Sequence, residues 1–297
     1  MNTLKTGILM AGLFGLFMVL GRVFGGTAGL LLGFAFALAT NFFAYWFSDR
    51  VALSMSGAKA VDEAQAPGLY RMVRRLAQSA GLPMPSVHII PSAQPNAFAT
   101  GRDPNHAAVA VTEGLLRSLD EEELEGVLAH ELAHVQHRDI LISSIAATFA
   151  GAITLLVHVL QIGMLFGGLG RSGDDGEGTN PLAALAAIIF APLAAMVIQL
   201  AISRSREYEA DRGGAIMSGK PLALASALRR IEHAVEQRPM QVSPASSHMF
   251  IINPLGGDAV RSLAALFRTH PLTEERIARL QAMAHDIGGR ARQATSW

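Results

Sequence analysis

The sequence contains no cysteine among its 297 residues. Disulfide bonds and thiolate metal ligands are therefore excluded, and any bound metal must be held by histidine, aspartate or glutamate. Charge is also scarce: Asp, Glu, Lys and Arg make up 16% of the chain and hydrophobic residues 51%, which is too apolar for an ordinary soluble protein. The formal net charge is zero and the basic residues are scattered, so we expect no nucleic acid partner.

Four long apolar runs indicate membrane spans, at about residues 4–20, 26–47, 140–166 and 182–202. No A-x-A cleavage site follows the first run and the second comes at once, so this pair is expected to be an uncleaved hairpin rather than a signal peptide. The last two runs are richer in alanine and glycine. For them, the alternative is a pair of buried core helices.

The runs divide the chain into four parts. Residues 1–48 and 140–202 are expected to be transmembrane hairpins, and residues 49–139 and 203–297 to be two parts of one soluble domain. We therefore predict a mainly α, α+β protein with four transmembrane helices.

The first soluble part mixes helix and strand. Residues 67–80 have the apolar stripe of an amphipathic helix that ends at Gly81 and Pro83. Three short segments between Pro, Asn and Gly turns are predicted to be strands of a small antiparallel sheet: 87–90, 97–100 and 107–111. The segment Pro95–Thr100 is either a sheet edge on which an extended substrate could lie or an ordinary hairpin strand.

The distribution of basic residues predicts the orientation. Two basic residues fall in the short hairpin connections, Arg22 and Arg171. A larger group lies beside the opposite ends of the runs: Lys5, Arg50, Lys59, Arg204 and Arg206. By the positive-inside rule, both termini and the soluble parts are expected in the cytoplasm.

The segment His130-Glu131-Leu132-Ala133-His134 has the H-E-x-x-H pattern. Two histidines four apart on a helix point the same way, so both imidazoles can bind one ion, and the glutamate between them can serve as the base of a zinc hydrolase. Asp120 is a plausible N-cap, with Glu123 to close a capping box. The alternative is an ordinary amphipathic helix that carries two histidines.

A catalytic zinc ion takes three protein ligands and keeps one position open, so a third ligand must come from elsewhere. The best candidate is Glu207, on a helix that continues the fourth run. Asp211 lies on the same face and can hydrogen-bond a ligating imidazole. Gly213 and Gly214 keep that helix surface small enough to pack closely on the other. The alternative is that these acids solvate a surface helix.

The two candidate metal-bearing helices lie next to apolar runs. The third run begins six residues after His134, and Glu207 follows Ile202 by five. At about 1.5 Å per residue, the site is expected on the order of 10 Å from the bilayer. Membrane proteins or their cytoplasmic segments are therefore the expected substrates.

Taken together, these motifs resemble the HtpX family of bacterial membrane zinc metalloproteases, which is related to the Ste24 CaaX-processing proteases. The resemblance covers nearly the whole chain and rests on the four runs, the pentad and three further segments: Glu207-Tyr208-Glu209-Ala210-Asp211, Thr269-His270-Pro271-Leu272 and Glu275-Arg276-Ile277.

The resemblance implies a gluzincin-like protease domain on a four-helix anchor in the bacterial cytoplasmic (inner) membrane. It implies one zinc ion per chain at His130, His134 and Glu207, with Glu131 as the catalytic base. It makes His270 the candidate oxyanion donor, although a loop role for it is nearly as plausible, and Arg206 is a weaker candidate. It also implies quality control of misfolded or damaged cytoplasmic-membrane proteins, often under stress.

Two other functions remain open from the sequence. One is a peptidase for prenylated, CaaX-type substrates. The other is a non-catalytic membrane scaffold whose zinc is structural, which a fourth protein ligand would indicate.

Overall fold

The computed structural model describes residues 2–145, 204–237, 251 and 271–294. Its labelled elements follow in chain order: α1 (Asn2–Met55), β1 (Lys59–Ala60), α2 (Pro67–Ser79), β2 (Ser86–Ile90), β3 (Ala97–Gly101), η1 (Pro104–His106), β4 (Ala107–Thr112), α3 (Glu113–Ser118), α4 (Glu121–Gln136), α7 (Arg204–Ser218), α8 (Pro221–Gln237) and α10 (Thr273–Ala294). The predicted helix at 67–80 and the three predicted strands are confirmed to within about two residues.

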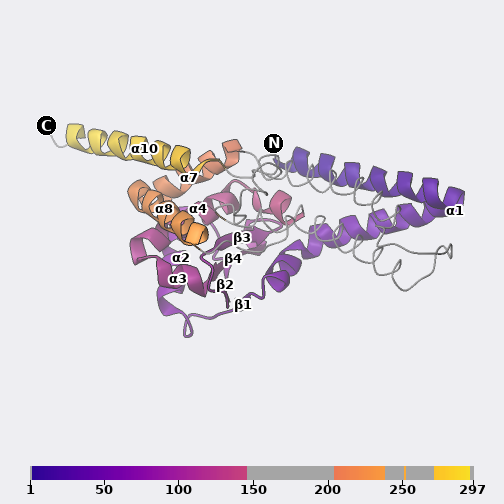
Figure 1. Cartoon of the computed structure of the whole chain (residues 1–297), viewed down its shortest axis with the longest axis horizontal. Coiled ribbons are helices and arrows are strands. Elements are labelled where there is room, and N and C mark those ends of the chain that lie inside the picture. Colours follow the sequence, from indigo (N-terminus) through magenta and orange to yellow (C-terminus); the bar gives the residue numbers. More distant parts are fainter. Residues whose placement is uncertain (1, 146–203, 238–250, 252–270, 295–297) are drawn as a thin grey trace, which may run out of the picture.

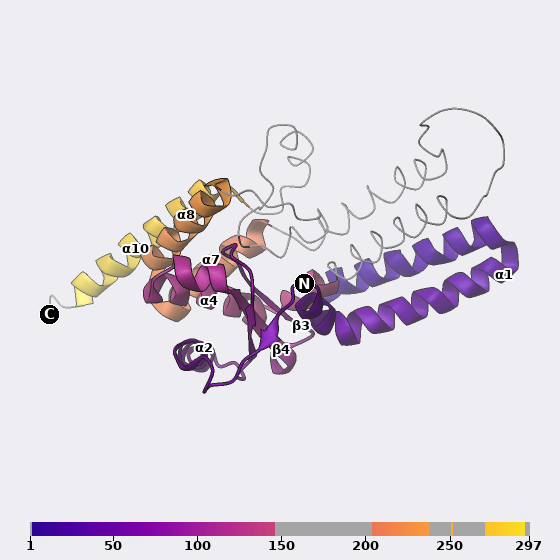
Figure 2. The same cartoon turned by 60° about the horizontal axis from the view of Figure 1, so that its bottom comes forward.

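Helix α1 forms two arms that project together from the body of the protein (Figures 1 and 2). The bend lies at Gly26, whose φ of 58° is in the left-handed region that glycine adopts readily. The arms touch through their backbones: a Cβ on Gly21 would collide with the carbonyl oxygen of Gly29, and one on Gly33 with that of Phe17. Small residues therefore allow the two arms to pack closely.

The second arm is long and apolar enough to cross a membrane. Within the described residues, Gly26–Met55 is the one helix that meets this test, and Thr6–Val19 in the first arm is a shorter apolar helix. Exposed side chains such as Leu32, Phe36 and Phe43 cover the second arm, which is expected of a surface that faces lipid. The predicted spans at 140–166 and 182–202 lie almost entirely outside the described residues, so a total of four stays a prediction.

The sheet is mixed, and the prediction of a purely antiparallel sheet is wrong. The strand order is β1-β2-β4-β3, with β2 parallel to β4 and the other two pairs antiparallel. Strand β3 follows β2 in the chain but pairs with β4 on its far side, so β4 lies between them. Alternation of apolar residues identifies strands but not their partners, which explains the error.

Helix α4 lies at the centre of the soluble body. It packs against the sheet on one side, while α7 and α8 contact its other faces and α10 packs along α8. One buried apolar cluster joins α2, the sheet, α4 and α8, with Leu76, Val109, Leu128 and Leu228 among its members. Each such side chain contributes roughly 1.5–3 kcal/mol on burial, so this cluster fixes the position of α4 and of the motif that it carries.

Candidate metal centre

The start of α4 is fixed by the predicted capping box, which is confirmed. The carboxylate of Asp120 accepts a hydrogen bond from the backbone of Glu123, and the Glu123 carboxylate accepts one from the backbone of Asp120. The negative charges of three glutamates in the first turn interact favourably with the positive end of the helix dipole. The H-E-x-x-H segment occupies the second half of this helix, with His130 and Glu131 buried.

Three potential metal donors converge where α4 meets α7. One ligand atom each from His130, His134 and Glu207 lies within 4.8 Å of the other two. The Nε2 atoms of His130 and His134 face the Glu207 carboxylate at 3.8 and 3.6 Å. These separations are too long for hydrogen bonds but suit donors arranged around one ion. Two imidazoles and a carboxylate are also a donor set that zinc takes in catalytic sites.

The other ring nitrogen of each histidine is held by a carboxylate. Nδ1 of His130 lies 2.9 Å from Oδ1 of Asp211, and Nδ1 of His134 lies 3.2 Å from Oδ2 of Asp139. An Nδ1–H that donates to a carboxylate leaves Nε2 with its lone pair toward the third donor. Both imidazoles are thus oriented for a cation.

Asp139 is a site residue that the sequence motifs do not predict. It follows the end of α4, after Arg138, whose φ of 58° turns the chain sharply. This turn brings the carboxylate back to His134, five residues earlier. The available signal was an aspartate five residues after His134, but the return of its side chain depends on a backbone conformation that residue types do not reveal.

A buried arginine from α10 connects the C-terminal helix to the site. The Nε and Nη2 atoms of Arg276 donate to both oxygens of Asp211, at 2.8 and 2.7 Å, and Nη1 donates to the carbonyl oxygen of Ile251. Burial of Asp211 acts to raise its pKa, but the charge and hydrogen bonds of Arg276 and the hydrogen bond of His130 outweigh burial and lower that pKa to about 2. Asp211 is therefore an anion that orients His130.

We expect Arg276→Ala to destabilise the fold by about 3–5 kcal/mol, because it leaves the buried charge of Asp211 without its partner. Chemical unfolding of the purified protein measures the change. Arg279→Ala is the matched control: Arg279 is exposed on the same helix, and its cation–π contact with Tyr208 is worth only about 0.5–1 kcal/mol. Equal losses in the two variants would contradict the role of the buried pair.

Glu131 lies between the metal donors and the sheet. One of its carboxylate oxygens accepts a hydrogen bond from the backbone N–H of Ala99 in β3, at 2.9 Å. Burial raises the pKa of Glu131 above its usual value, although His130 and His134 act in the opposite direction. A carboxylate with a raised pKa is better suited to accept and return a proton near neutral pH.

Two helices carry the donors, and glycine lets them approach. A Cβ on Gly214 would lie 2.7 Å from the backbone nitrogen of His130 and 2.9 Å from its Cα. Gly214 follows Glu207 by seven residues and so lies on the same face of α7. The distance between Glu207 and the imidazoles is therefore set by a backbone contact that only glycine allows.

We expect Gly214→Ala to cost roughly 1–3 kcal/mol of stability and to weaken metal binding, because the added methyl group must push α7 away from α4. Gly68→Ala, at an open position of α2, is the control and should leave both properties nearly unchanged. Metal titration together with thermal unfolding measures the pair of variants. Unchanged metal affinity in Gly214→Ala would contradict the close-packing argument.

Of the two candidate oxyanion donors, the structure describes Arg206. His270 lies outside the described residues. Arg206 is buried, and its Nη1 lies 3.8 Å from the Asp139 carboxylate. Burial lowers its pKa, although the charges of Asp139 and Glu207 act to raise it. The Arg206 guanidinium therefore lies next to the acidic side chains of the site.

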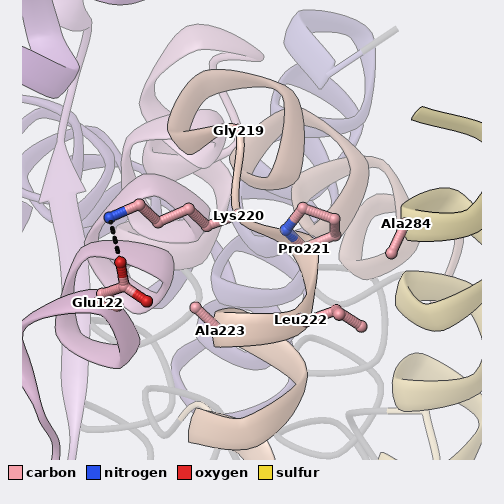
Figure 3. A pocket seen from close by; sticks show the side chains of 7 residues that line it. All are labelled: Glu122, Gly219, Lys220, Pro221, Leu222, Ala223 and Ala284. Carbon is pink, nitrogen blue, oxygen red and sulfur yellow. Dashed lines mark ion pairs between the residues drawn. The ribbon is translucent and has the colours of Figure 1, made fainter. Parts of the chain in front are cut away.

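A separate hollow of about 350 Å³ lies where α7 turns into α8, and Figure 3 shows its lining. Lys220 points across it toward Glu122, with 3.0 Å between Nζ and Oε1. The hollow contains none of the three donors and no catalytic candidate. The hollow is therefore separate from the candidate metal centre between α4 and α7.

Comparison with known proteins agrees with this geometry. Residues 63–284 match peptidase family M48. The chain is similar to proteins named "Protease HtpX homolog" from Pelotomaculum thermopropionicum (55% identity, covering 96% of this chain and 100% of the relative), Thermococcus kodakarensis (56%, covering 96% and 97%) and Ralstonia nicotianae (55%, covering 95% and 97%).

The fold is also similar to the crystal structure of S. mikatae Ste24p, with a TM-score of 0.50 and 19% identity. The match covers 94% of this chain, which spans 65% of that longer one. The family match covers most of the chain, and the curated relatives match it over nearly their whole length. The chain therefore belongs to peptidase family M48 and is a membrane metalloprotease.

Proposed function

We propose that this metalloprotease is a zinc endopeptidase, with one zinc ion held by His130, His134 and Glu207 and with Glu131 as the catalytic base. The observation that carries the proposal is the convergence of one ring nitrogen from each histidine and one carboxylate oxygen within 4.8 Å, beside a buried glutamate. In the described part of the chain this group contains three ligand side chains and no fourth. Three protein donors favour a catalytic ion over a structural one, and so the enzyme over the scaffold.

The residues then have distinct roles in peptide hydrolysis. A zinc ion bound here would act as a Lewis acid that polarises the scissile carbonyl and makes water acidic enough to attack near neutral pH. Glu131 accepts the proton of the attacking water and delivers it to the leaving amine. Asp211 and Asp139 keep the imidazoles in the tautomer that can bind the ion. His270 is proposed as the oxyanion donor from its motif.

Substrates are proposed to bind as extended segments along β3. This strand is at the edge of the sheet, and the N–H of its residue Ala99 points to Glu131. Addition of a substrate strand to this edge brings a peptide bond to the catalytic base and uses backbone groups that every polypeptide has. Such recognition suits unfolded segments of many sequences, which supports a role in removing misfolded or damaged membrane proteins.

The site is proposed to lie at the cytoplasmic face of the inner membrane, with both termini in the cytoplasm. The distribution of basic residues supports the orientation. Closeness to the bilayer is supported by Ile142 and Ile145, which lie soon after α4 and pack with Ala44 and Leu13 of the α1 hairpin. The proposed division into hairpins at 1–48 and 140–202 follows from the same runs.

Removal and replacement of the metal tests this function. Cleavage of an unfolded membrane-protein segment by the detergent-purified enzyme should stop after treatment with a chelator. It should return on addition of one equivalent of zinc per chain. Full activity of a demonstrably metal-free protein would contradict the proposal.

A further inference from the structure

Strand β3 runs toward the membrane. Near its start, Phe98 belongs to one buried cluster with Ala52 of α1. Just after its end, the guanidinium of Arg102 stacks on the ring of Trp46, 4.9 Å from the ring centre. Trp46 precedes Ala52 by six residues, or about 9 Å of helix, and lies nearer the bend at Gly26. The second arm of α1 and β3 therefore point in opposite directions, and β3 points into the hairpin.

A second set of contacts gives the same direction. The Oγ atoms of Thr100 and Ser144 are 2.7 Å apart, and the Gly101 N–H donates to Ser144 at 3.5 Å. Ser144 lies between Ile142 and Ile145, which pack with Ala44 of the second arm. The C-terminal end of β3 is thus fixed to residues that lie against the hairpin, closer to its bend than Ala52 is.

The outer edge of β3 faces Glu131 of α4, the proposed catalytic base. Thr112 donates its N–H to the carbonyl oxygen of Asn96. In an antiparallel pair, the residues whose backbone groups face the partner strand recur at every second position. In β3 these residues are therefore Phe98 and Thr100. The residues between them, Ala97 and Ala99, direct their N–H and C=O groups away from β4. The hydrogen bond from Ala99 to Glu131 agrees with this alternation.

We propose that the enzyme prefers membrane proteins whose anchoring helix lies on the N-terminal side of the cleaved segment. This inference rests on the proposed function and on the second arm of α1 as a span. Antiparallel pairing is slightly more stable than parallel pairing, so the favoured substrate strand runs opposite to β3. Because β3 points toward the membrane, such a substrate strand runs away from the membrane. Its N-terminal end is therefore the end next to the bilayer.

The geometry also limits the length of the linker. Gly101, at the membrane end of the strand, lies two positions after Ala99, which marks the cleavage position, and this step spans about 7 Å. A segment that follows its membrane helix within a few residues can therefore reach the site directly. A segment anchored at its C-terminal side must first travel outward and then return, which needs a longer linker.

A set of matched substrates tests the preference. One unfolded segment is fused to the same membrane helix at either its N-terminal or its C-terminal end, with linkers of about eight or about 40 residues. Each fusion is placed in vesicles with the wild-type enzyme, and the segment without a helix is the control. With the short linker, we expect the N-terminally anchored segment to be cleaved at least about tenfold faster, since misplacement of the scissile bond costs rate steeply. With the long linker, the two rates should agree within about twofold, because the flexible chain can turn back.

The outcomes separate this inference from the function on which it rests. If the two short-linker substrates are cleaved equally fast, or the C-terminally anchored one faster, the preference is wrong while the endopeptidase stands. If no substrate, including the unanchored segment, is cleaved faster by the wild type than by Glu131→Gln, then the proposed function fails, and the preference fails with it.

Discussion

Glu131→Gln is expected to leave the metal bound and to reduce peptide cleavage by at least about 100-fold, because a positioned acid–base group typically contributes roughly 10² to 10⁴ in rate. Glutamine has the shape of glutamate and its side-chain oxygen can still accept the Ala99 N–H, so the fold and the edge strand should persist. An amide cannot take a proton from water. Metal content and cleavage rate, measured on the same detergent-purified sample, check both parts of the expectation.

The matched control for this variant is Glu209→Gln. Glu209 lies two residues after Glu207 on α7, but its side chain is exposed. We therefore expect nearly wild-type metal content and activity. Substantial cleavage by Glu131→Gln would remove this residue from the role of base, whereas an equal loss in Glu209→Gln would point to a general sensitivity to lost charge.

His130→Ala is expected to lose the metal and with it all peptidase activity. The substitution removes one of the three proposed metal donors. It also removes the imidazole that Asp211, itself paired with Arg276, holds in place. Loss of a residue that only orients a ligand typically costs about 10–100-fold in metal affinity, and loss of a ligand should cost more. Metal titration of the purified variant measures the difference.

Two further variants make this series decisive. Asp139→Asn should weaken metal affinity by about 10–100-fold, since Asp139 holds His134 but is not itself proposed to bind the ion. His233→Ala, an exposed histidine on α8, should have no effect. If Asp139→Asn binds the metal more weakly than His130→Ala does, the assignment of His130 as a ligand and Asp139 as a supporting residue is wrong.

Local features of the fold could be predicted from the sequence because their causes are local. The capping box of Asp120 and Glu123 and the helix that follows depend on residues within one or two turns. The same is true of the three predicted strands. The pentad places two imidazoles on one helix face by spacing alone. For these features, periodicity and capping chemistry were sufficient.

Features that depend on tertiary contacts could not be predicted in the same way. The parallel pairing of β2 with β4 depends on the path of β3, which residue types do not encode locally. The return of Asp139 to His134 requires the turn at Arg138. The placement of Glu207 requires α7 to approach α4 as closely as Gly214 permits. The structure brings Glu207 and Asp211 to the pentad, while their roles toward a metal stay predictions.

The most direct test of the central claim is an anomalous X-ray measurement at the zinc absorption edge on crystals of the active enzyme. We predict one zinc ion per chain, at about 2.0–2.2 Å from Nε2 of His130, Nε2 of His134 and a carboxylate oxygen of Glu207. We also predict that no fourth protein side chain binds the ion. A zinc ion bound elsewhere, or a closed site with four protein ligands, would contradict this assignment.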